Sequence, residues 1–568
     1  MAATATATAA APANGAEALL AVLESAGVEQ AFGLPGVHNL PLWAALQRSG
    51  IRLVGVRHEQ TAVYAADGSA RATGRLGVAI TTTGPGAANA LGATGEAMES
   101  KSPVLVIATD IAAALRRPGV HRGVLHETRD QAGMFAPVVK AALRVTRVEE
   151  LPVLAAEAIR IALAPSSGPV YLEIPTDLLK APLAAGPEPA AGSLPSRLGV
   201  GPEPAEASAT EAVASIDEVA ALLAGAERPL IWAGGGALRG GAGDAVGRLA
   251  TALAAPVIET YLGRGLMPLE HPCRVGLPPH VPEVGALWDE ADVVVAVGTD
   301  FDGMMTQNWL QPRPPRLVVI NVDPADGTKN YGADAVLVGE AADLCGMLAR
   351  RLEARDGVQA VGARLAQLRE EVMARLEAEH PEAATLLSTV RDALPAEAVL
   401  FCDMCIPGYW LGAFHPVAGP RKLGYPMGWG TLGFGFPASL GAALAQPAPV
   451  LSVCGDGGFL FACGELATAA QDNIPVTVLL VDDGGYGMLR FDQRLAGEDT
   501  FGTELHTPDF VALATAFGVE AEEVEDLGTS LAGALERHLS NGRPSMIVVR
   551  AALDPPPTTS PSWYRRRA

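Results

Sequence analysis

Two short apolar segments, each followed at once by acids and glycines, constrain the fold of this chain most strongly. Residues 450–454 lead into the sequence GDGG (455–458), and residues 476–481 lead into the paired acids Asp482 and Asp483. The spacing fits a strand, a helix and a return strand of one parallel sheet. The acids that follow the two strands then lie at the carboxyl edge of that sheet, where open α/β sheets bind ligands.

The residue types at this edge suit a magnesium ion and a diphosphate. Mg²⁺ prefers hard oxygen ligands in a near-octahedral shell that it shares with phosphates. Asp456, Asp483 and the backbone carbonyl of Gly485 offer such oxygens, and the glycines let backbone amides approach a diphosphate closely. An ordinary strand-to-turn segment would also carry Asp-Gly signals, but it does not require a second acidic turn at a matching distance.

Length and composition indicate a large globular protein. The 568 residues suggest three or four domains, and 49% hydrophobic against 18% charged residues support large buried cores. A net charge of −22 argues against nucleic-acid binding. No apolar run is long enough to cross a membrane. The sparse cysteines suit the reducing cytoplasm, and the CxxC spacing of Cys402 and Cys405 fits a strand end leading into a loop better than a metal or redox pair.

Apolar strands alternate with helical segments along the whole chain, which predicts an α/β protein with three doubly wound parallel-sheet domains. A Pro- and Ala-rich stretch that contains GPEP twice is expected to be a linker between the first two domains. The expected division is a disordered tail at 1–15, domains at 16–183, 211–355 and 356–553, the linker at 184–210 and a C-terminal tail at 554–568.

The stretch 455–489 resembles the GDG-to-NN signature of thiamine-diphosphate enzymes, in the superfamily of acetolactate synthases and 2-oxoacid decarboxylases. The family usually carries Asn where this chain has Asp483, which adds a negative charge beside the diphosphate. The resemblance implies a pyrimidine-binding domain, a central Rossmann-like domain and a diphosphate-binding domain, with thiamine diphosphate and Mg²⁺ as cofactors. The cofactor-binding residues that it implies in this stretch are Gly455, Asp456, Gly457, Gly458, Asp483, Gly485, Tyr486, Gly487 and Met488.

Two further segments carry the same resemblance. RHEQTAVYAADGSARATG (57–74) is similar to the family's HEQ-AADGYAR segment, which implies that Glu59 contacts the aminopyrimidine ring nitrogen. Taken alone, Glu59 would be an acid in the first turn of a helix. Residues 428–437 resemble the family's G-x-M-G-x-G-x-P segment, so Leu432 is expected to be the apolar wedge between the two cofactor rings. The Gly430 carbonyl is expected to accept a hydrogen bond from the amino group.

The substrate end is less strongly marked. By the same resemblance, the cofactor-binding residues of the first domain are Pro35, Gly36, Thr83 and Asn89, and the catalytic candidates beside Glu59 are His38 and Gln131. A structural role is the alternative for His38, and His126 is a weaker candidate than His38. The segment GLPGVHNLPLW is similar to branches that include a decarboxylase of the arginine-derived 2-oxo acid. The acids Asp300 and Asp302 would suit a cationic substrate tail.

The resemblance implies decarboxylation of a 2-oxo acid, followed by carboligation as in acetolactate synthases or by release of an aldehyde. It also implies a homodimer or homotetramer with active sites at the subunit interface, and no nucleic-acid or membrane partner is expected. A flavin-bearing synthase or oxidase is one alternative, although Gly234–Gly236 lack the GxGxxG spacing of a dinucleotide site and FAD is therefore less favoured. A catalytically silent homologue is another, which would be expected to have lost Glu59, the wedge or the metal acids.

Overall fold

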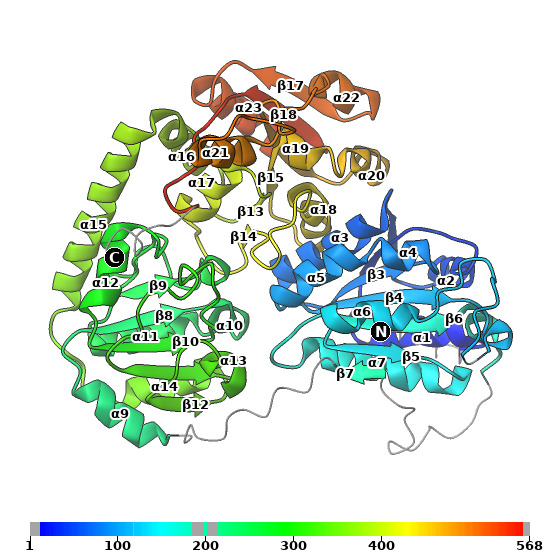
Figure 1. Cartoon of the computed structure of the whole chain (residues 1–568), viewed down its shortest axis with the longest axis horizontal. Helices are drawn as coiled ribbons and strands as arrows, with labels where there is room; N and C mark the ends of the chain where they lie inside the picture. The colour runs from blue at the N-terminus through cyan, green and yellow to red at the C-terminus, as the bar shows by residue number, and fades with distance from the viewer. Residues whose placement is uncertain (1–11, 118, 184–197, 201–213, 560–568) are drawn as a thin grey trace, which may run out of the picture. The chain divides into compact units, whose positions relative to one another are not determined.

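The computed structural model describes residues 12–117, 119–183, 198–200 and 214–559. The chain divides into two compact units, one built around the first of three sheets and the other around the second and third. Helices flank each sheet (Figure 1). The predicted fold class, α/β with three doubly wound parallel sheets, is confirmed.

The N-terminal sheet has the strand order β2-β1-β3-β4-β6-β5-β7, in which β7 alone runs antiparallel to its neighbour. The strands are β1 (Gln30–Gly33), β2 (Arg52–Gly55), β3 (Gly77–Thr81), β4 (Val104–Asp110), β5 (Ala141–Arg144), β6 (Val170–Pro175) and β7 (Leu198–Val200). The helices are α1 (Gly15–Ser25), α2 (Leu40–Leu46), α3 (Glu59–Thr73), α4 (Pro85–Ala88), α5 (Leu91–Glu99), α6 (Gln131–Phe135), α7 (Leu151–Leu163) and α8 (Thr176–Lys180).

The central sheet has the order β12-β11-β10-β8-β9, with all strands parallel. Its strands are β8 (Pro229–Ala233), β9 (Val257–Glu259), β10 (Val293–Val297), β11 (Leu317–Asn321) and β12 (Ala335–Val338). Its helices are α9 (Ile216–Ala224), α10 (Gly235–Arg239), α11 (Gly243–Leu253), α12 (Pro282–Glu290), α13 (Pro324–Thr328) and α14 (Ala341–Arg351). The long helix α15 (Val358–Glu379) leads to the C-terminal sheet.

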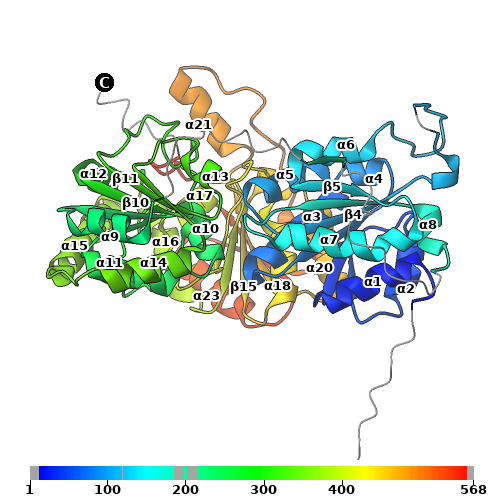
Figure 2. The same cartoon turned by 90° about the horizontal axis from the view of Figure 1, so that it is seen from below.

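The C-terminal sheet has the order β14-β13-β15-β16-β18-β17, again entirely parallel. Its strand β15 is labelled in Figure 2. Its strands are β13 (Val399–Cys402), β14 (Leu423–Gly424), β15 (Val450–Gly455), β16 (Val476–Asp482), β17 (Glu520–Val524) and β18 (Ser545–Arg550). The helices are α16 (Pro381–Ala393), α17 (Ile406–Phe414), α18 (Gly435–Ala445), α19 (Asp456–Phe459), α20 (Leu466–Asp472), α21 (Gly487–Ala496), α22 (Phe510–Ala516) and α23 (Thr529–Leu539).

The central and C-terminal sheets share one continuous apolar core, which explains why they form a single unit. The core includes Trp232 of β8 and Trp288 of α12 in the central domain and Trp410 of α17 in the C-terminal domain. Arg264 joins the two domains by donating hydrogen bonds to the backbone carbonyls of Ala413 and His415. A buried guanidinium bound in this way satisfies carbonyls that would otherwise be costly to bury.

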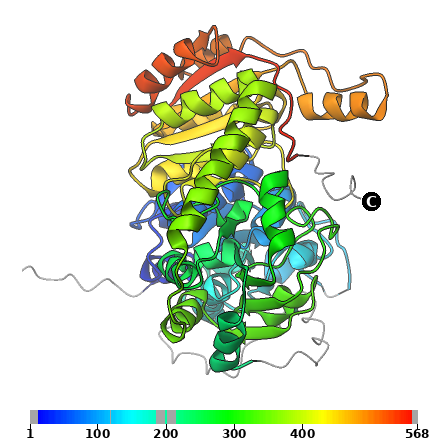
Figure 3. The same ribbon diagram turned by 90° about the vertical axis from the view of Figure 1, so that its left-hand side faces the viewer.

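The register of the C-terminal sheet places the residues of interest. Gly455 at the end of β15 pairs with Val481 of β16, so Asp456 and Asp483 follow at the same carboxyl edge, as the sequence predicts. Helix α21 begins just beyond this edge, and none of its residues is buried. In Figure 3 it is the orange helix that stands away from the sheet.

Several sequence predictions fall outside the described residues. These are most of the tail at 1–15, most of the linker at 184–210 and most of the tail at 554–568. Within the expected linker, Leu198–Val200 are described and form the short strand β7. Among the described helices, none combines the length and apolar character needed to cross a bilayer. The cytoplasmic location stays a prediction.

Candidate active site

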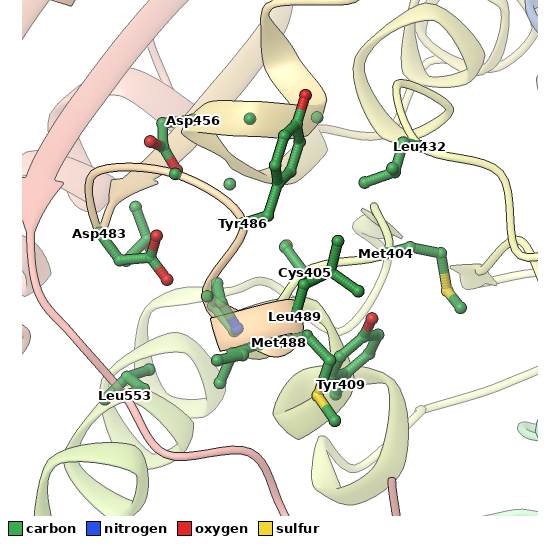
Figure 4. Close-up of a pocket in the computed structure, with 18 of the residues that line it drawn as sticks. Met404, Cys405, Tyr409, Leu432, Asp456, Asp483, Tyr486, Met488, Leu489 and Leu553 are labelled. Atoms are coloured by element: carbon green, nitrogen blue, oxygen red, sulfur yellow. The ribbon is translucent and has the colours of Figure 1, made fainter. Parts of the chain in front are cut away.

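A pocket of about 230 Å³ lies at the carboxyl edge of the C-terminal sheet. Every cofactor-binding residue that the sequence predicts in this domain lines it: Gly430, Leu432, Gly455, Asp456, Gly457, Gly458, Asp483, Gly485, Tyr486, Gly487 and Met488. In Figure 4 the two acids lie at one end of the pocket, and Leu432 and Met404 lie at the other. The pocket is therefore polar at one end and apolar at the other.

Glycines bring the two acidic turns into contact. A side-chain carbon added to Gly457 would lie 2.8 Å from the Tyr486 ring and 3.3 Å from the Gly485 carbonyl oxygen. Gly485 has a φ of 147°, and a carbon added there would meet the Thr503 carbonyl. Only glycine allows backbone segments to approach so closely.

The two acids form a donor set that needs a cation. Asp456 is 1% exposed, and its Oδ2 has no hydrogen-bond partner in the described residues. Burial, followed by the charge of Asp483, raises the pKa of Asp456 to about 7. A buried carboxylate with an unpaired oxygen, beside the half-buried carboxylate of Asp483, is unfavourable without a cation at that oxygen. The residues present thus fit an oxygen-coordinated divalent ion.

The charge that Asp483 adds is balanced by Arg490. The guanidinium donates to the Asp483 side chain at 2.8 Å and to the Asp483 carbonyl at 2.7 Å. It also donates to the Gly484 carbonyl at 3.0 Å. Burial raises the pKa of Asp483, and Arg490 opposes this shift. The turn therefore carries an acid without adding net charge to the site.

No group of three or more His, Cys, Asp or Glu side chains arranged to hold a metal occurs anywhere in the described residues. A site made of Asp456, Asp483 and a carbonyl therefore leaves several coordination positions to other ligands. Mg²⁺ is typically held in this way, by one or two carboxylates together with substrate phosphates. The donor set suits a metal that binds together with a diphosphate.

Leu432 is held in place by the glycines on either side of it. Gly430 has a φ of 68° and Gly433 a φ of 74°, both in the left-handed region. Residues other than glycine rarely adopt this conformation. The loop thus presents one apolar side chain, Leu432, to the pocket.

Asp403 anchors this loop and was not predicted from the sequence. Its carboxylate accepts hydrogen bonds from the backbone amides of Met404 at 2.8 Å, Gly433 at 3.1 Å and Phe434 at 3.4 Å. Asp403 is 1% exposed, and burial raises its pKa to about 6. The signal that could have found it is an acid directly after strand β13, at the same edge as Asp456.

Other lining residues were not predicted to belong to the site, because most of them are apolar and none is one of the glycines, acids or wedge residues that mark the cofactor-binding motifs. They are Met404, Cys405, Ile406, Pro407, Tyr409, Val481, Leu489, Ala551 and Leu553. Cys402 ends β13 and Cys405 precedes α17, and both thiols are free, as the strand-end interpretation expects. Burial raises the pKa of both thiols, which disfavours thiolate chemistry.

Glu59 lies in the N-terminal unit at the start of α3, where the chain leaves β2. It is 6% exposed, and Asn89 donates a hydrogen bond to its Oε2 at 3.0 Å. A carbon added to Gly86 would lie 3.1 Å from the other carboxylate oxygen and 2.7 Å from Thr82. Gly36 packs against Thr82 in the same way. The structure thus brings the predicted Gly36, Glu59 and Asn89 to one edge of this sheet, while Pro35 beside them is exposed.

His38 and Thr83 meet at the same edge. The Nδ1 atom of His38 lies 2.7 Å from the hydroxyl of Thr83, which in turn lies 3.0 Å from the hydroxyl of Thr109. Burial, and then the charge of His126, lower the pKa of His38. The histidine ring is thereby oriented by the sheet.

Gln131 is fully buried, and its amide is fully used. Its oxygen accepts from the Gly84 amide at 2.6 Å, and its nitrogen donates to the Thr109 carbonyl and the Tyr171 hydroxyl, both at 2.9 Å. The nitrogen also lies 3.2 Å from Glu173. This geometry suits a residue that positions the turn at Gly84, and the catalytic role predicted for Gln131 stays untested.

Two predictions concern the central domain. The carboxylate of Asp300 accepts from Lys329 Nζ at 2.8 Å, so a cation within the chain already pairs with it. A carbon added to Gly234 or Gly236 would lie 2.4 or 2.8 Å from the Gly298 carbonyl. Close packing between β8 and β10 thus accounts for these glycines, and bound FAD stays an untested alternative.

Comparisons with known proteins cover all three sheets. The N-terminal domain model of the thiamine pyrophosphate enzymes matches residues 13–134. The central domain model of these enzymes matches residues 216–348, and the C-terminal thiamine pyrophosphate-binding domain model matches residues 405–549.

Whole-length relatives agree with these matches. A probable 2-ketoarginine decarboxylase of Pseudomonas aeruginosa is 37% identical over 93% of this chain and 91% of its own length. A probable acetolactate synthase large subunit of Methanocaldococcus jannaschii is 32% identical over 90% of this chain and 87% of its own. The large subunit of acetolactate synthase isozyme 2 of Escherichia coli is 31% identical over 90% of this chain and 91% of its own.

The shared charge of the two acids predicts a pH-dependent stability of the cofactor-free protein. Because the pKa of Asp456 is raised from about 3.9 to about 7, the folded state binds a proton more tightly than the unfolded state. This contribution is favourable below about pH 4 and is lost as the pH rises through about 7. We expect the thermal midpoint of the wild type to fall from pH 5 to pH 8 more steeply than that of Asp456→Asn.

Added Mg²⁺ should raise the midpoint of the wild type more at pH 8 than at pH 5, because the ion competes with the proton. Asp499 is an exposed acid in the loop after α21 and provides a control. The thermal midpoint of Asp499→Asn should depend on pH and Mg²⁺ as that of the wild type does. If the thermal midpoints of the wild type and Asp456→Asn depended on pH in the same way, the raised pKa assigned to Asp456 would be contradicted.

The hydrogen bonds of Asp403 predict an effect on cofactor affinity. In Asp403→Asn, the amide can accept at one oxygen only, so the loop that carries Leu432 loses part of its anchor. Hydrogen bonds to charged groups contribute about 1.5–3 kcal/mol each, so thiamine diphosphate should bind at least about tenfold more weakly. Quenching of tryptophan fluorescence at saturating Mg²⁺ would measure this. Asp392→Asn, at an exposed acid, should leave the affinity unchanged, and an unchanged affinity in Asp403→Asn would refute the anchoring role.

Proposed function

The chain belongs to the thiamine pyrophosphate enzyme family, and on this basis we propose that it decarboxylates a 2-oxo acid with the help of thiamine diphosphate and Mg²⁺. The observation that carries the proposal is the pocket in which a buried acid, Asp456, and a half-buried acid, Asp483, face an apolar wedge, Leu432, at the edge of one sheet. Many enzymes bind a metal and a diphosphate. The combination with a buried Glu59 beside Asn89 is what thiamine diphosphate requires.

Each part of the proposed site has a defined task. Asp456, Asp483 and the Gly485 carbonyl would hold Mg²⁺, and the amides of the 455–458 turn would bind the diphosphate. Leu432 would serve as the apolar wedge between the two rings, and the Gly430 carbonyl would accept a hydrogen bond from the amino group. When bound, the cofactor acts as the electron sink for loss of carbon dioxide.

Glu59 holds a proton at the aminopyrimidine nitrogen. Burial shields its carboxyl group from bulk water, and the hydrogen bond from Asn89 fixes its orientation. A shielded and oriented acid suits general acid–base catalysis. Pro35, Gly36 and Thr83 complete the proposed wall on this side, with His38 as the catalytic candidate nearest to them.

We place Glu59 and the metal acids of one active site on different subunits, as the family resemblance implies. The smallest active form would then be a homodimer, and a homotetramer would contain two such pairs. The substrate is a small 2-oxo acid, and nucleic acid and membrane partners are not expected. The family includes both outcomes, aldehyde release and carboligation to an acyloin.

The names of the relatives suggest two candidate reactions. One relative is a probable 2-ketoarginine decarboxylase, and the others are acetolactate synthases. The ion pair of Asp300 with Lys329 removes support for Asp300 as a partner of a cationic substrate tail. The name of the relative at 37% identity still favours testing a guanidino 2-oxo acid first.

A panel of 2-oxo acids with products identified by mass spectrometry tests the proposal. It should include pyruvate, 2-oxobutyrate and the guanidino 2-oxo acid, each with and without an added acceptor aldehyde. We expect carbon dioxide from at least one member, in a reaction that needs both thiamine diphosphate and Mg²⁺. The absence of carbon dioxide from every member, with cofactor bound, would refute the proposal.

Glu59→Gln should abolish turnover while the fold stays intact. The amide keeps the shape of the side chain and its contact with Asn89, but it cannot exchange a proton with the ring nitrogen. Loss of a positioned acid–base group typically costs about 10²- to 10⁴-fold in rate. Circular dichroism and the thermal midpoint should match those of the wild type, and near-wild-type activity would exclude this mechanism.

The flavin alternative has its own measurement. A flavin-bearing synthase or oxidase would absorb visible light at about 450 nm after purification, because the bound flavin itself absorbs there. A colourless protein that still decarboxylates a 2-oxo acid would exclude the alternative. A catalytically silent homologue would show neither flavin absorption nor turnover. The presence of Glu59, Leu432 and both metal acids argues against this alternative.

A further inference from the structure

A second cavity, of about 160 Å³, lies within the unit that contains the central and C-terminal sheets. Most of its lining comes from the segment 394–398 before β13, the segment 415–418 after α17, and Lys422 directly before β14. Because β13 and β14 both begin beside it, the cavity lies at the amino edge of the sheet, opposite the edge that holds Asp456. The two pockets have no lining residue in common, so this is a separate site.

Two cationic side chains line this cavity. Lys422 donates from Nζ to the backbone carbonyl of Glu397 at 2.6 Å, and no acid forms an ion pair with it among the residues that the structure describes. Arg391 pairs with the exposed acid Asp392, with 2.7 Å between its Nε and the carboxylate. The charge of Arg391 is therefore balanced within the chain, whereas that of Lys422 is left for another anion.

His415 adds a buried polar atom to the lining. The residue is 8% exposed, and its Nδ1 atom has no hydrogen-bond partner in the described part of the chain. Burial, followed by the charges of Arg264 and Arg391, lowers the pKa of His415 to about 4, so the ring is neutral near pH 7. A neutral imidazole still carries one N–H that can donate to an anion. Since buried polar atoms are normally hydrogen-bonded, an unpaired nitrogen in a cavity wall indicates that a polar group belongs in the cavity.

Arg264 places a permanent positive charge behind His415. It is 5% exposed, and its guanidinium donates to the backbone carbonyls of Ala413 and His415. It takes part in no ion pair within the described ranges, because the buried acid Glu259 pairs with Arg274 instead, at 3.0 Å. A charge in the protein interior is screened less than one in water. The electrostatic field at His415 therefore favours an anion.

The remainder of the cavity wall is apolar. Leu269 comes from the central domain, and Leu394, Val417 and Ala418 come from the C-terminal domain. A water molecule takes up about 30 Å³ of liquid, so the cavity has room for about five or six groups of that size. A charged head with a short carbon chain matches both the cationic and the apolar parts of this lining, whereas a bare inorganic anion matches only the first.

The elements that begin or end at this cavity also lead to the cofactor pocket. Strand β13 runs from the cavity toward Asp403, which anchors the Leu432 loop. Helix α17 runs from Cys405 and Tyr409, which line the cofactor pocket (Figure 4), to His415. A ligand in the cavity would therefore contact the far ends of elements that shape the cofactor pocket.

We propose that the cavity at the amino edge of the C-terminal sheet is a binding site for a short-chain organic carboxylate. The carboxylate accepts hydrogen bonds from Lys422 and from the ring N–H of His415, and the carbon chain packs against the apolar wall. Binding is reversible, and no covalent bond is made or broken. The site is additional to the one proposed for the 2-oxo acid, which lies with the cofactor at the opposite edge.

Isothermal titration calorimetry of the holoenzyme, with thiamine diphosphate and Mg²⁺ at saturation, tests this site with butanoate as the probe. Butanoate has no 2-oxo group, so it cannot be decarboxylated during the titration. We expect saturable binding at one such site per chain. Inorganic phosphate and butanol should both bind more weakly, because each keeps only the charge or only the carbon chain.

Two variants and a matched control locate the binding. Lys422→Gln should weaken butanoate binding at least about tenfold, because a hydrogen bond between two charged groups is lost. Ala396→Phe should abolish it, because the added ring fills the cavity without changing the charge. Arg543 is an exposed cation before β18, at the same edge of the sheet but outside the cavity. Arg543→Gln should keep the wild-type affinity within about twofold, since exposed charges are screened.

The ring of His415 gives a direct signal. In protein with ¹⁵N-labelled histidine, the signal that His415→Gln removes should shift when butanoate is added to the wild type. The same signal should stay in place when butanoate is added to Ala396→Phe. A His415 signal that butanoate leaves unmoved in the wild type would exclude the ring as a ligand-binding group.

Three calorimetric results would overturn the proposal. They are the absence of saturable butanoate binding, equal binding by the wild type and Ala396→Phe, and equal affinity for butanoate and butanol. Thermal midpoints show whether the variants fold, and if one variant does not fold, the other tests the same cavity. Failure of the proposed decarboxylation would leave these results unchanged, because none of the measurements requires turnover.

Discussion

The parallel pairing of β15 with β16 is the interaction on which the site depends. Its register brings Asp456 and Asp483 to one edge, where burial and mutual repulsion raise the pKa of Asp456 to about 7. The sheet thus holds two like charges together, and the free energy of that arrangement becomes favourable when a cation binds. Metal binding and the packing of this domain are therefore linked.

In the N-terminal unit as well, neighbouring strand ends bring functional side chains to one edge of a sheet. Strands β1, β3 and β4 are neighbours in this sheet, and residues at or just after their carboxyl ends (Gly36, Thr83 and Asp110) lie at one edge. Buried hydrogen bonds such as those of Gln131 fix the turns at this edge, so Glu59 and His38 are oriented before any ligand binds. A preorganised edge lowers the cost of arranging groups during catalysis.

The sequence predicted the sheets and the glycines, acids and wedge residue that line the pocket of the C-terminal domain, because strand ends, glycines and acids leave local signals. It did not predict Asp403, because a lone acid after a strand gains meaning only when the loop at Gly433 folds back onto it. It did not pair His38 with His126, because the contact depends on a left-handed turn and on the path of a long loop. Asp300 was predicted to suit a cationic substrate tail because the sequence does not show that Lys329, which is remote in sequence, pairs with it.

The contact of Arg490 with position 483 has a consequence for how this site can change over evolutionary time. The arginine donates to two backbone carbonyls of the turn as well as to the Asp483 side chain, so most of its hydrogen bonds do not depend on what residue 483 is. Replacement of the acid by an amide would therefore leave the turn in shape. Position 483 can therefore be Asp or Asn as long as Arg490 is kept. Loss of Arg490 would leave the charge of Asp483 unbalanced and would favour Asn at this position.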